Sequence, residues 1–178
     1  MSFFKSIVNW FEYGSAKLVT DFGRIYSAKL GDETFTVDAK LMQEGELWAL
    51  RLDFRRQWGN TGNREVVDCY FKKLKDIKKP FHELVNDVNA KVIETNLASG
   101  LATKILTGVS AGEILRGYGR IDNHPKNDAR FHTELFLSKK ASQYWLLLSV
   151  GRGSVEWSKW PVDAAKAIDQ LLEQIKTP

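Results

Sequence analysis

Residues 34–41, TFTVDAKL, alternate between polar and apolar side chains, and this alternation decides the fold of the first half of the chain. Every second residue from Phe35 to Leu41 is apolar. Because the side chains of a strand point alternately to its two faces, a period of two indicates a half-buried strand. The same period continues over residues 47–56, starting at Trp48, so the sequence predicts neighbouring antiparallel strands of one sheet.

A second copy of this pattern lies further along the chain. Residues 130–137, RFHTELFL, follow the first stretch at an offset of 96, and Gly23-Arg24-Ile25 recurs at that offset as Gly119-Arg120-Ile121. With one more residue of offset, WALRL at 48–52 falls on WLLLS at 145–149. The order of element types is also the same in both halves, and such an order identifies a repeat better than single matches do.

Each half is expected to contain four strands followed by one helix. In the first half the strands span residues 20–30, 34–42, 47–56 and 66–71, and the helix starts at Pro80. In the second half they span residues 113–122, 130–138, 144–150 and 155–157, and the helix starts at Pro161. The prolines differ by 81 residues and the strands by 96, which predicts an insert of about fifteen residues in the first half, roughly 59–79.

These patterns predict an α+β protein of two tandem β-β-β-β-α repeats, residues 19–96 and 97–178, in one compact domain. Each helix is expected to cover the apolar face of a sheet, and the other faces to stay open. Residues 1–18 are expected to form a short amphipathic helix with Phe3, Phe4, Ile7, Val8 and Phe11 on one face. Packing within the domain or on a sister subunit is favoured for that helix over docking on another protein or a membrane.

The order of elements in residues 19–176 resembles that of the whirly domain and of the PUR-repeat proteins, both built from two β-β-β-β-α units. The resemblance rests on topology and repeat order. It implies binding of single-stranded DNA or RNA across the sheets, with little sequence specificity and often by a homo-oligomer.

Aromatic and arginine side chains recur at matching positions of the first strand in both halves. Simple alternation places Phe22, Arg24 and Tyr26 on one side of that strand, and its counterpart carries Arg116, Tyr118 and Arg120. Rings can stack on the bases of a single strand, and arginines can contact its phosphates. These residues are therefore predicted to bind nucleic acid, with cross-strand packing as the alternative explanation.

The formal charge of +4 is concentrated between residues 51 and 79, which hold nine basic and four acidic side chains. Arg51 and Arg55 share the outer face of the third strand with Asp53 between them. The remaining predicted contacts are Arg56 and Trp58 at the end of that strand, Lys72 and Lys73 in the insert, and Arg130, Lys139, Lys140 and Arg152 in the second half. The alternative for the insert is that its lysines form a solvent-exposed loop that does not bind nucleic acid.

Catalytic signatures are scarce. Cys69 lies in an apolar stretch and is expected to be a buried thiol, and the three histidines lack the spacing of a zinc site. No phosphate-binding glycine loop is present, and a metal site at Asp122, His132 and Glu134 is only a minor alternative. No catalytic residue, metal or cofactor is therefore predicted.

The sequence favours non-catalytic binding of single-stranded nucleic acid, RNA ahead of DNA, by a homo-oligomer without a small-molecule substrate. A cytoplasmic location is expected, because one cysteine suits a reducing compartment and no signal peptide or membrane span is recognisable. The alternative is a structural or adaptor protein that self-assembles or docks a partner through the N-terminal helix and a sheet edge.

Overall fold

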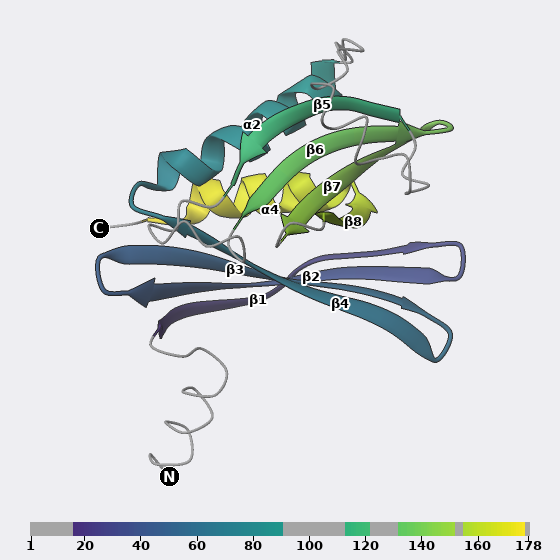
Figure 1. Cartoon of the computed structure of the whole chain (residues 1–178). Helices are drawn as coiled ribbons and strands as arrows, with labels where there is room; N and C mark the ends of the chain where they lie inside the picture. Colours follow the sequence, from purple (N-terminus) through teal and green to yellow (C-terminus); the bar gives the residue numbers. More distant parts are fainter. Residues whose placement is uncertain (1–15, 91–112, 122–131, 152–154, 177–178) are drawn as a thin grey trace.

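The computed structural model describes residues 16–90, 113–121, 132–151 and 155–176, which form two antiparallel sheets and two helices (Figure 1). The first sheet contains β1 (Lys17–Leu30), β2 (Glu33–Glu44), β3 (Leu47–Trp58) and β4 (Thr61–Phe71), and α2 (Leu74–Ala90) follows it. The second contains β5 (Glu113–Arg120), β6 (Thr133–Lys140), β7 (Gln143–Gly151) and β8 (Val155–Pro161), and α4 (Asp163–Gln174) follows it. The fold is thus α+β, and each sheet is a meander in which consecutive strands pair. The predicted N-terminal helix lies outside the described residues.

The two sheets share one hydrogen-bonding register, as expected for two copies of one unit. Leu18 pairs with Met42 and Gly23 with Ala39 in the first sheet. Their counterparts 96 residues later, Ile114 with Ser138 and Gly119 with Leu135, pair in the second. Both hairpin turns between the second and third strands also have the same length. The offset therefore stays at 96 beyond this turn, so Trp48 corresponds to Tyr144, and the expected match of Trp48 with Trp145 is wrong.

The expected insert after the third strand is mostly regular structure. β4 pairs with β3 as far as Thr61 opposite Trp58, so residues 61–71 extend a long hairpin. α2 begins at Leu74, and Pro80 lies inside it. The helix start at Pro80 was therefore wrong, and so was the insert length derived from it. The two halves differ mainly in the length of the hairpin between their third and fourth strands. Eight residues separate the paired Arg55 and Arg64 in the first half, and only three separate the paired Gly151 and Val155 in the second.

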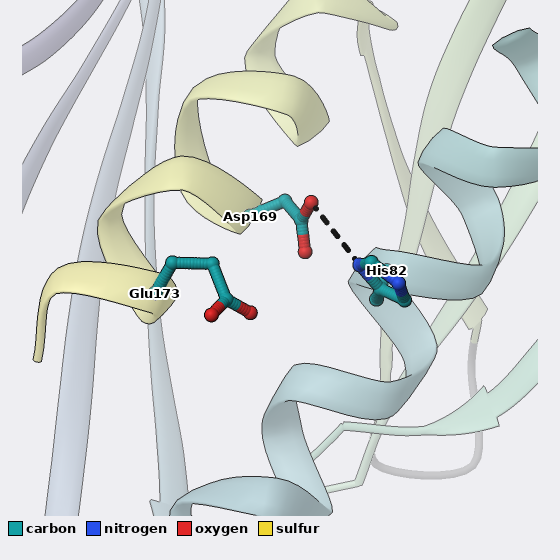
Figure 2. Close-up of side chains that lie close together, drawn as sticks. All are labelled: His82, Asp169 and Glu173. Carbon is teal, nitrogen blue, oxygen red and sulfur yellow. Dashed lines mark ion pairs between the residues drawn. The ribbon is translucent and has the colours of Figure 1, made fainter.

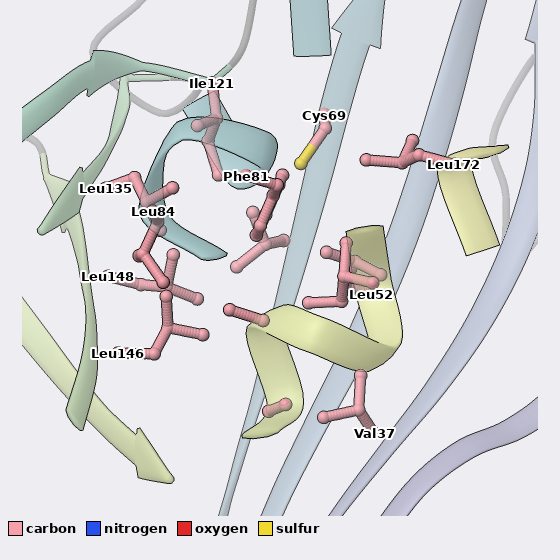
Figure 3. Close-up of a cluster of buried hydrophobic side chains, with 14 of the residues drawn as sticks. Val37, Leu52, Cys69, Phe81, Leu84, Ile121, Leu135, Leu146, Leu148 and Leu172 are labelled. Carbon is pink, nitrogen blue, oxygen red and sulfur yellow. The ribbon is translucent and has the colours of Figure 1, made fainter. Parts of the chain in front are cut away.

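The helices form a layer between the two sheets. They pack against each other, and each also contacts both sheets: α2 packs on β4, β5 and β6, and α4 on β1 and β8. Buried side chains from both helices and from β2–β8 form one continuous core, including Val37 and Leu52 from the first sheet and Leu135 from the second (Figure 3), and partly buried side chains of β1 pack against it. The predicted burial of Cys69 is confirmed. No helix in the described ranges has the length and hydrophobicity needed to cross a membrane.

Candidate nucleic-acid interface

The outer face of the first sheet, which points away from the helices, carries an open hollow of about 670 Å³. Polar residues on β1, β2, β3 and β4 alternate with the core-facing ones and so gather on this face. The hollow is lined by Asp21, Gly23, Arg24, Asp38, Lys40, Arg51, Asp53, Arg55, Arg64 and Val66. We call this surface the arginine face.

At the end of the same sheet face where β3 begins, the character changes from charged to apolar. Met42, Ala49 and Tyr70 are buried there in a second, smaller core cluster with Ala16. The expectation that the outer faces stay open therefore holds only for the charged half of this face.

Each arginine of the arginine face is held by an aspartate. Arg24 donates Nε and Nη2 hydrogen bonds to Asp38 at 2.9 and 3.4 Å. Arg55 and Arg64 both bind Asp53, each with an Nη2–Oδ2 distance of 2.7 Å. A fourth fork joins Arg51 to Asp68 at 2.6 and 2.7 Å, and Lys40 lies 3.7 Å from Asp21. Two-pronged pairs of this kind fix the plane of the guanidinium as well as its position.

The exposure of the two kinds of charge differs. The side chains of Asp53 and Asp38 are only 13% and 20% exposed, whereas those of Arg24, Arg55 and Arg64 are 51%, 46% and 60% exposed. Asp53 and Asp38 thus lie beneath the guanidiniums of Arg24, Arg55 and Arg64. The other two pairs differ, because Arg51 and Asp68 are equally covered and Asp21 is more exposed than Lys40. Since Arg24 and Arg55 bind the aspartates through Nε and Nη2, the Nη1 edge of each points away from the carboxylate.

The pKa values reflect these pairs. Burial raises the pKa of Asp53, but hydrogen bonds from Arg55 and Arg64 outweigh it and bring the pKa to about 2. The hydrogen bond and charge of Asp38 raise the pKa of Arg24, and those of Asp53 raise the pKa of Arg55. Asp53 is therefore ionised at neutral pH, and its charge offsets part of the positive charge of Arg55 and Arg64.

The predicted row of Phe22, Arg24 and Tyr26 does not exist. Phe22 and Tyr26 pack against the core, while Arg24 pairs with Asp38 on the opposite face. The reason is a pair of register shifts in β1, between Asp21 and Gly23 and between Arg24 and Tyr26. Each shift adds a residue that breaks simple alternation.

The corresponding row of the second half does not form a binding surface either, because Tyr118 and Arg116 both contact α2. Tyr118 packs against the core, and its hydroxyl donates to Asp87 of α2 at 2.6 Å. Arg116 donates to the same carboxylate at 2.8 Å. Arg120 lies opposite Glu134 in the register, as Arg24 lies opposite Asp38. The equivalence of Arg24 and Arg120 is thus confirmed, but the aromatic residues beside them are structural.

Arg56 and Trp58 lie beside the aromatic edge of the core and outside the arginine face. Arg56 donates to Glu33 at 3.0 Å, and its guanidinium lies over the rings of Phe35 and Trp58 at 5.6 and 5.3 Å. Phe35 in turn packs edge-on against Trp160 at 5.6 Å. Trp160 is buried in the core, and Trp58 remains partly exposed.

The outer face of the second sheet is largely closed. Phe136, Ser138, Leu147 and Ser149 point away from the core-facing Leu135 and Leu146, yet they are buried. The expectation of an open binding face there was therefore wrong for its centre. Lys140 is exposed at the end of β6, and Lys139 lies 5.3 Å from the ring of Tyr144. Arg130 and Arg152 lie outside the described residues.

Lys72 and Lys73 are exposed in the link between β4 and α2, at the end of the sheet where β3 begins. Among the predicted residues that the structure describes, only Arg24, Arg51 and Arg55 come together on the arginine face. Sequence reasoning missed Lys40 and Arg64. Lys40 follows from the alternation of residues 34–41, whereas Arg64 required knowing that the hairpin continues past Gly59.

Of the three residues of the alternative metal site, the structure describes two. His132 and Glu134 lie 3.1 Å apart on the second sheet, and Asp122 is outside the described residues.

In comparisons with known proteins, no family model matches the chain, and no curated protein matches it significantly in sequence.

Proposed function

We propose that the chain binds single-stranded nucleic acid on the arginine face. The observation that carries the proposal is the layered arrangement of charge, in which half-exposed guanidiniums stand over largely covered carboxylates. Guanidiniums held in fixed planes can contact phosphates through their outward edges and stack on bases. The open hollow admits a flexible strand across β1–β4.

The expected affinity is moderate because the face is nearly neutral. Five cations, Arg24, Lys40, Arg51, Arg55 and Arg64, are set against the four aspartates 21, 38, 53 and 68. The three exposed arginines suit about three phosphate contacts, which corresponds to a slope of about −2 in log K against log salt for a single strand. Contacts to phosphates and base faces carry little sequence information, so weak sequence preference is expected.

The test is fluorescence anisotropy with a labelled single-stranded RNA, the matching DNA strand and their duplex. We expect R24A/R55A/R64A to weaken single-strand binding at least about tenfold and to remove most of the salt slope. The variant R24K/R55K/R64K keeps the charge but loses the two-pronged geometry, and it is expected to lose part of the affinity.

The charge-matched control is K72A/K73A/K75A, which removes three exposed lysines near the start of α2. An equal or greater loss in this control would move the interface away from the arginine face. Unchanged binding in R24A/R55A/R64A, or preference for the duplex, would also overturn the proposal. Failure of the wild-type chain to bind any strand, combined with self-association or capture of a partner protein, would favour the adaptor alternative.

A further inference from the structure

A histidine and two carboxylates converge where α2 and α4 meet, away from the arginine face. His82 lies on α2, and Asp169 and Glu173 lie one turn apart on α4 (Figure 2). Residues four apart on a helix share a face, so α4 presents both carboxylates to α2. One nitrogen or oxygen atom from each of the three residues lies within 4.8 Å of the other two.

Asp169 is the unusual member of this group because it is buried without enough partners. The residue is 9% exposed, and its neighbours Ile168 and Leu172 belong to the core. Its Oδ2 lies 3.5 Å from Nδ1 of His82, longer than a normal hydrogen bond. Its Oδ1 is buried and accepts no hydrogen bond in the part of the chain that the structure describes. Buried carboxylates are normally paired or bound to a metal.

The unpartnered oxygen points into the space between His82 and Glu173 (Figure 2). From this geometry we propose that His82, Asp169 and Glu173 bind a divalent first-row transition cation such as zinc. Imidazole nitrogen and carboxylate oxygen are typical ligands of such ions, and three protein ligands leave a fourth position for water.

The side chains can reach metal-binding distances with small movements. A tetrahedral zinc site places its ligand atoms about 3.4 Å apart, at metal–ligand distances of about 2.0–2.2 Å. His82 and Glu173 are 56% and 61% exposed, so both can rotate toward the buried Asp169. The bound ion would join the helix that follows the first sheet to the helix that follows the second, and would therefore stabilise the folded chain.

Lys78 competes for this site. Its Nζ lies 3.3 Å from Glu173, so a metal ion must displace an ammonium group that also repels it. This arrangement predicts that removing Lys78 strengthens metal binding. An accidental surface site elsewhere on the molecule would not respond to Lys78.

The experiment is isothermal titration calorimetry of the full chain with zinc chloride, with thermal denaturation as a second measurement. We expect one ion per chain, a zinc-dependent rise in Tm, and at least about tenfold weaker binding in both H82A and E173Q. Both changes are at exposed side chains, and the Tm of each variant without zinc checks that it is folded. K78M is expected to bind several-fold more tightly.

The control is H132A, which removes another histidine that lies beside a carboxylate, Glu134, and should leave zinc binding unchanged. The proposal fails if no stoichiometric site is found, or if H82A and E173Q bind zinc like the wild type. It also fails if H132A loses as much affinity as H82A, or if zinc raises the Tm of all variants equally.

Discussion

Asp53 is the residue on which the arginine face depends. It is a largely covered carboxylate that holds two half-exposed guanidiniums, those of Arg55 and Arg64. Neither arginine could keep its orientation in solvent without such an acceptor, because a free arginine side chain samples many rotamers. Asp53 therefore lowers the net charge of the face and also fixes the orientation of two of its arginines.

Asp53 should make the stability of the chain depend on acidity. Its pKa in the folded protein, about 2, lies below the ordinary value of 3.8. Because the pKa of Asp53 is lower in the folded state, its ionised carboxylate contributes to the free energy of unfolding. This contribution is complete above about pH 5 and is lost as the pH falls from about 4 to about 2. We expect D53N to lower the free energy of unfolding by about 1 kcal/mol at pH 7, since both partner arginines are well solvated.

The measurement is urea denaturation of the wild type and D53N at several pH values between 7 and 2. The difference between them should shrink as the pH approaches 2. A difference that stays constant over this range would show that the ion pairs do not contribute.

At the scale of elements, the bulges of β1 and β5 set which side chains reach each face. Gly23 and Gly119 occupy equivalent positions and both have positive φ, 65° and 80°. A Cβ atom at Gly23 would meet no heavy atom within 4 Å, so only backbone strain opposes a larger residue there. The bulge turns Phe22 toward the core and Arg24 toward solvent.

We expect G23A to lower the free energy of unfolding by about 1–2 kcal/mol, the cost of a left-handed conformation for a residue with a Cβ. G23N should lose less, because asparagine tolerates this conformation better than alanine does. Chemical denaturation of the three proteins checks the order. Equal stability of G23A and the wild type would mean that the bulge can relax without cost.

Much of the strand layout could be predicted from sequence, because polar and apolar residues alternate over residues 34–41 and 50–55, which pair as β2 and β3. Which side chains of β1 lie on which face could not be predicted, because each bulge reverses the alternation and no simple period in the sequence reveals the bulge. The predicted start of α2 lies too far along the chain, because Pro80 is inside the helix and not in its first turn. Arg64 was missed because the fourth strand was expected to begin at residue 66, whereas β4 begins at Thr61.

At the scale of the whole molecule, the two sheets depend on one core. Each helix contacts both sheets, and Leu172 of α4 is completely buried in the cluster that joins them. Such an arrangement predicts that the two halves unfold together, because neither sheet can keep its covering helices when the other is lost.

We expect L172A to cost about 2–5 kcal/mol through lost burial and the cavity left behind. Hydrogen exchange measured by mass spectrometry should show protection falling by the same free energy in β2 and β6. Q170A, at an exposed position of the same helix, is the control and should change little. Loss of protection in the second sheet alone would contradict a shared core.

The most direct test of the proposed function is to map where a bound strand touches the chain. A single-stranded RNA containing 4-thiouridine is cross-linked by ultraviolet light to the wild-type protein, and the modified peptides are identified by mass spectrometry. Binding on the arginine face predicts cross-links in residues 20–28 of β1 and 51–66 of the β3–β4 hairpin, competed by unlabelled single strand. Cross-links confined to α2 or to the second sheet, or the absence of any competed cross-link, would contradict the proposal.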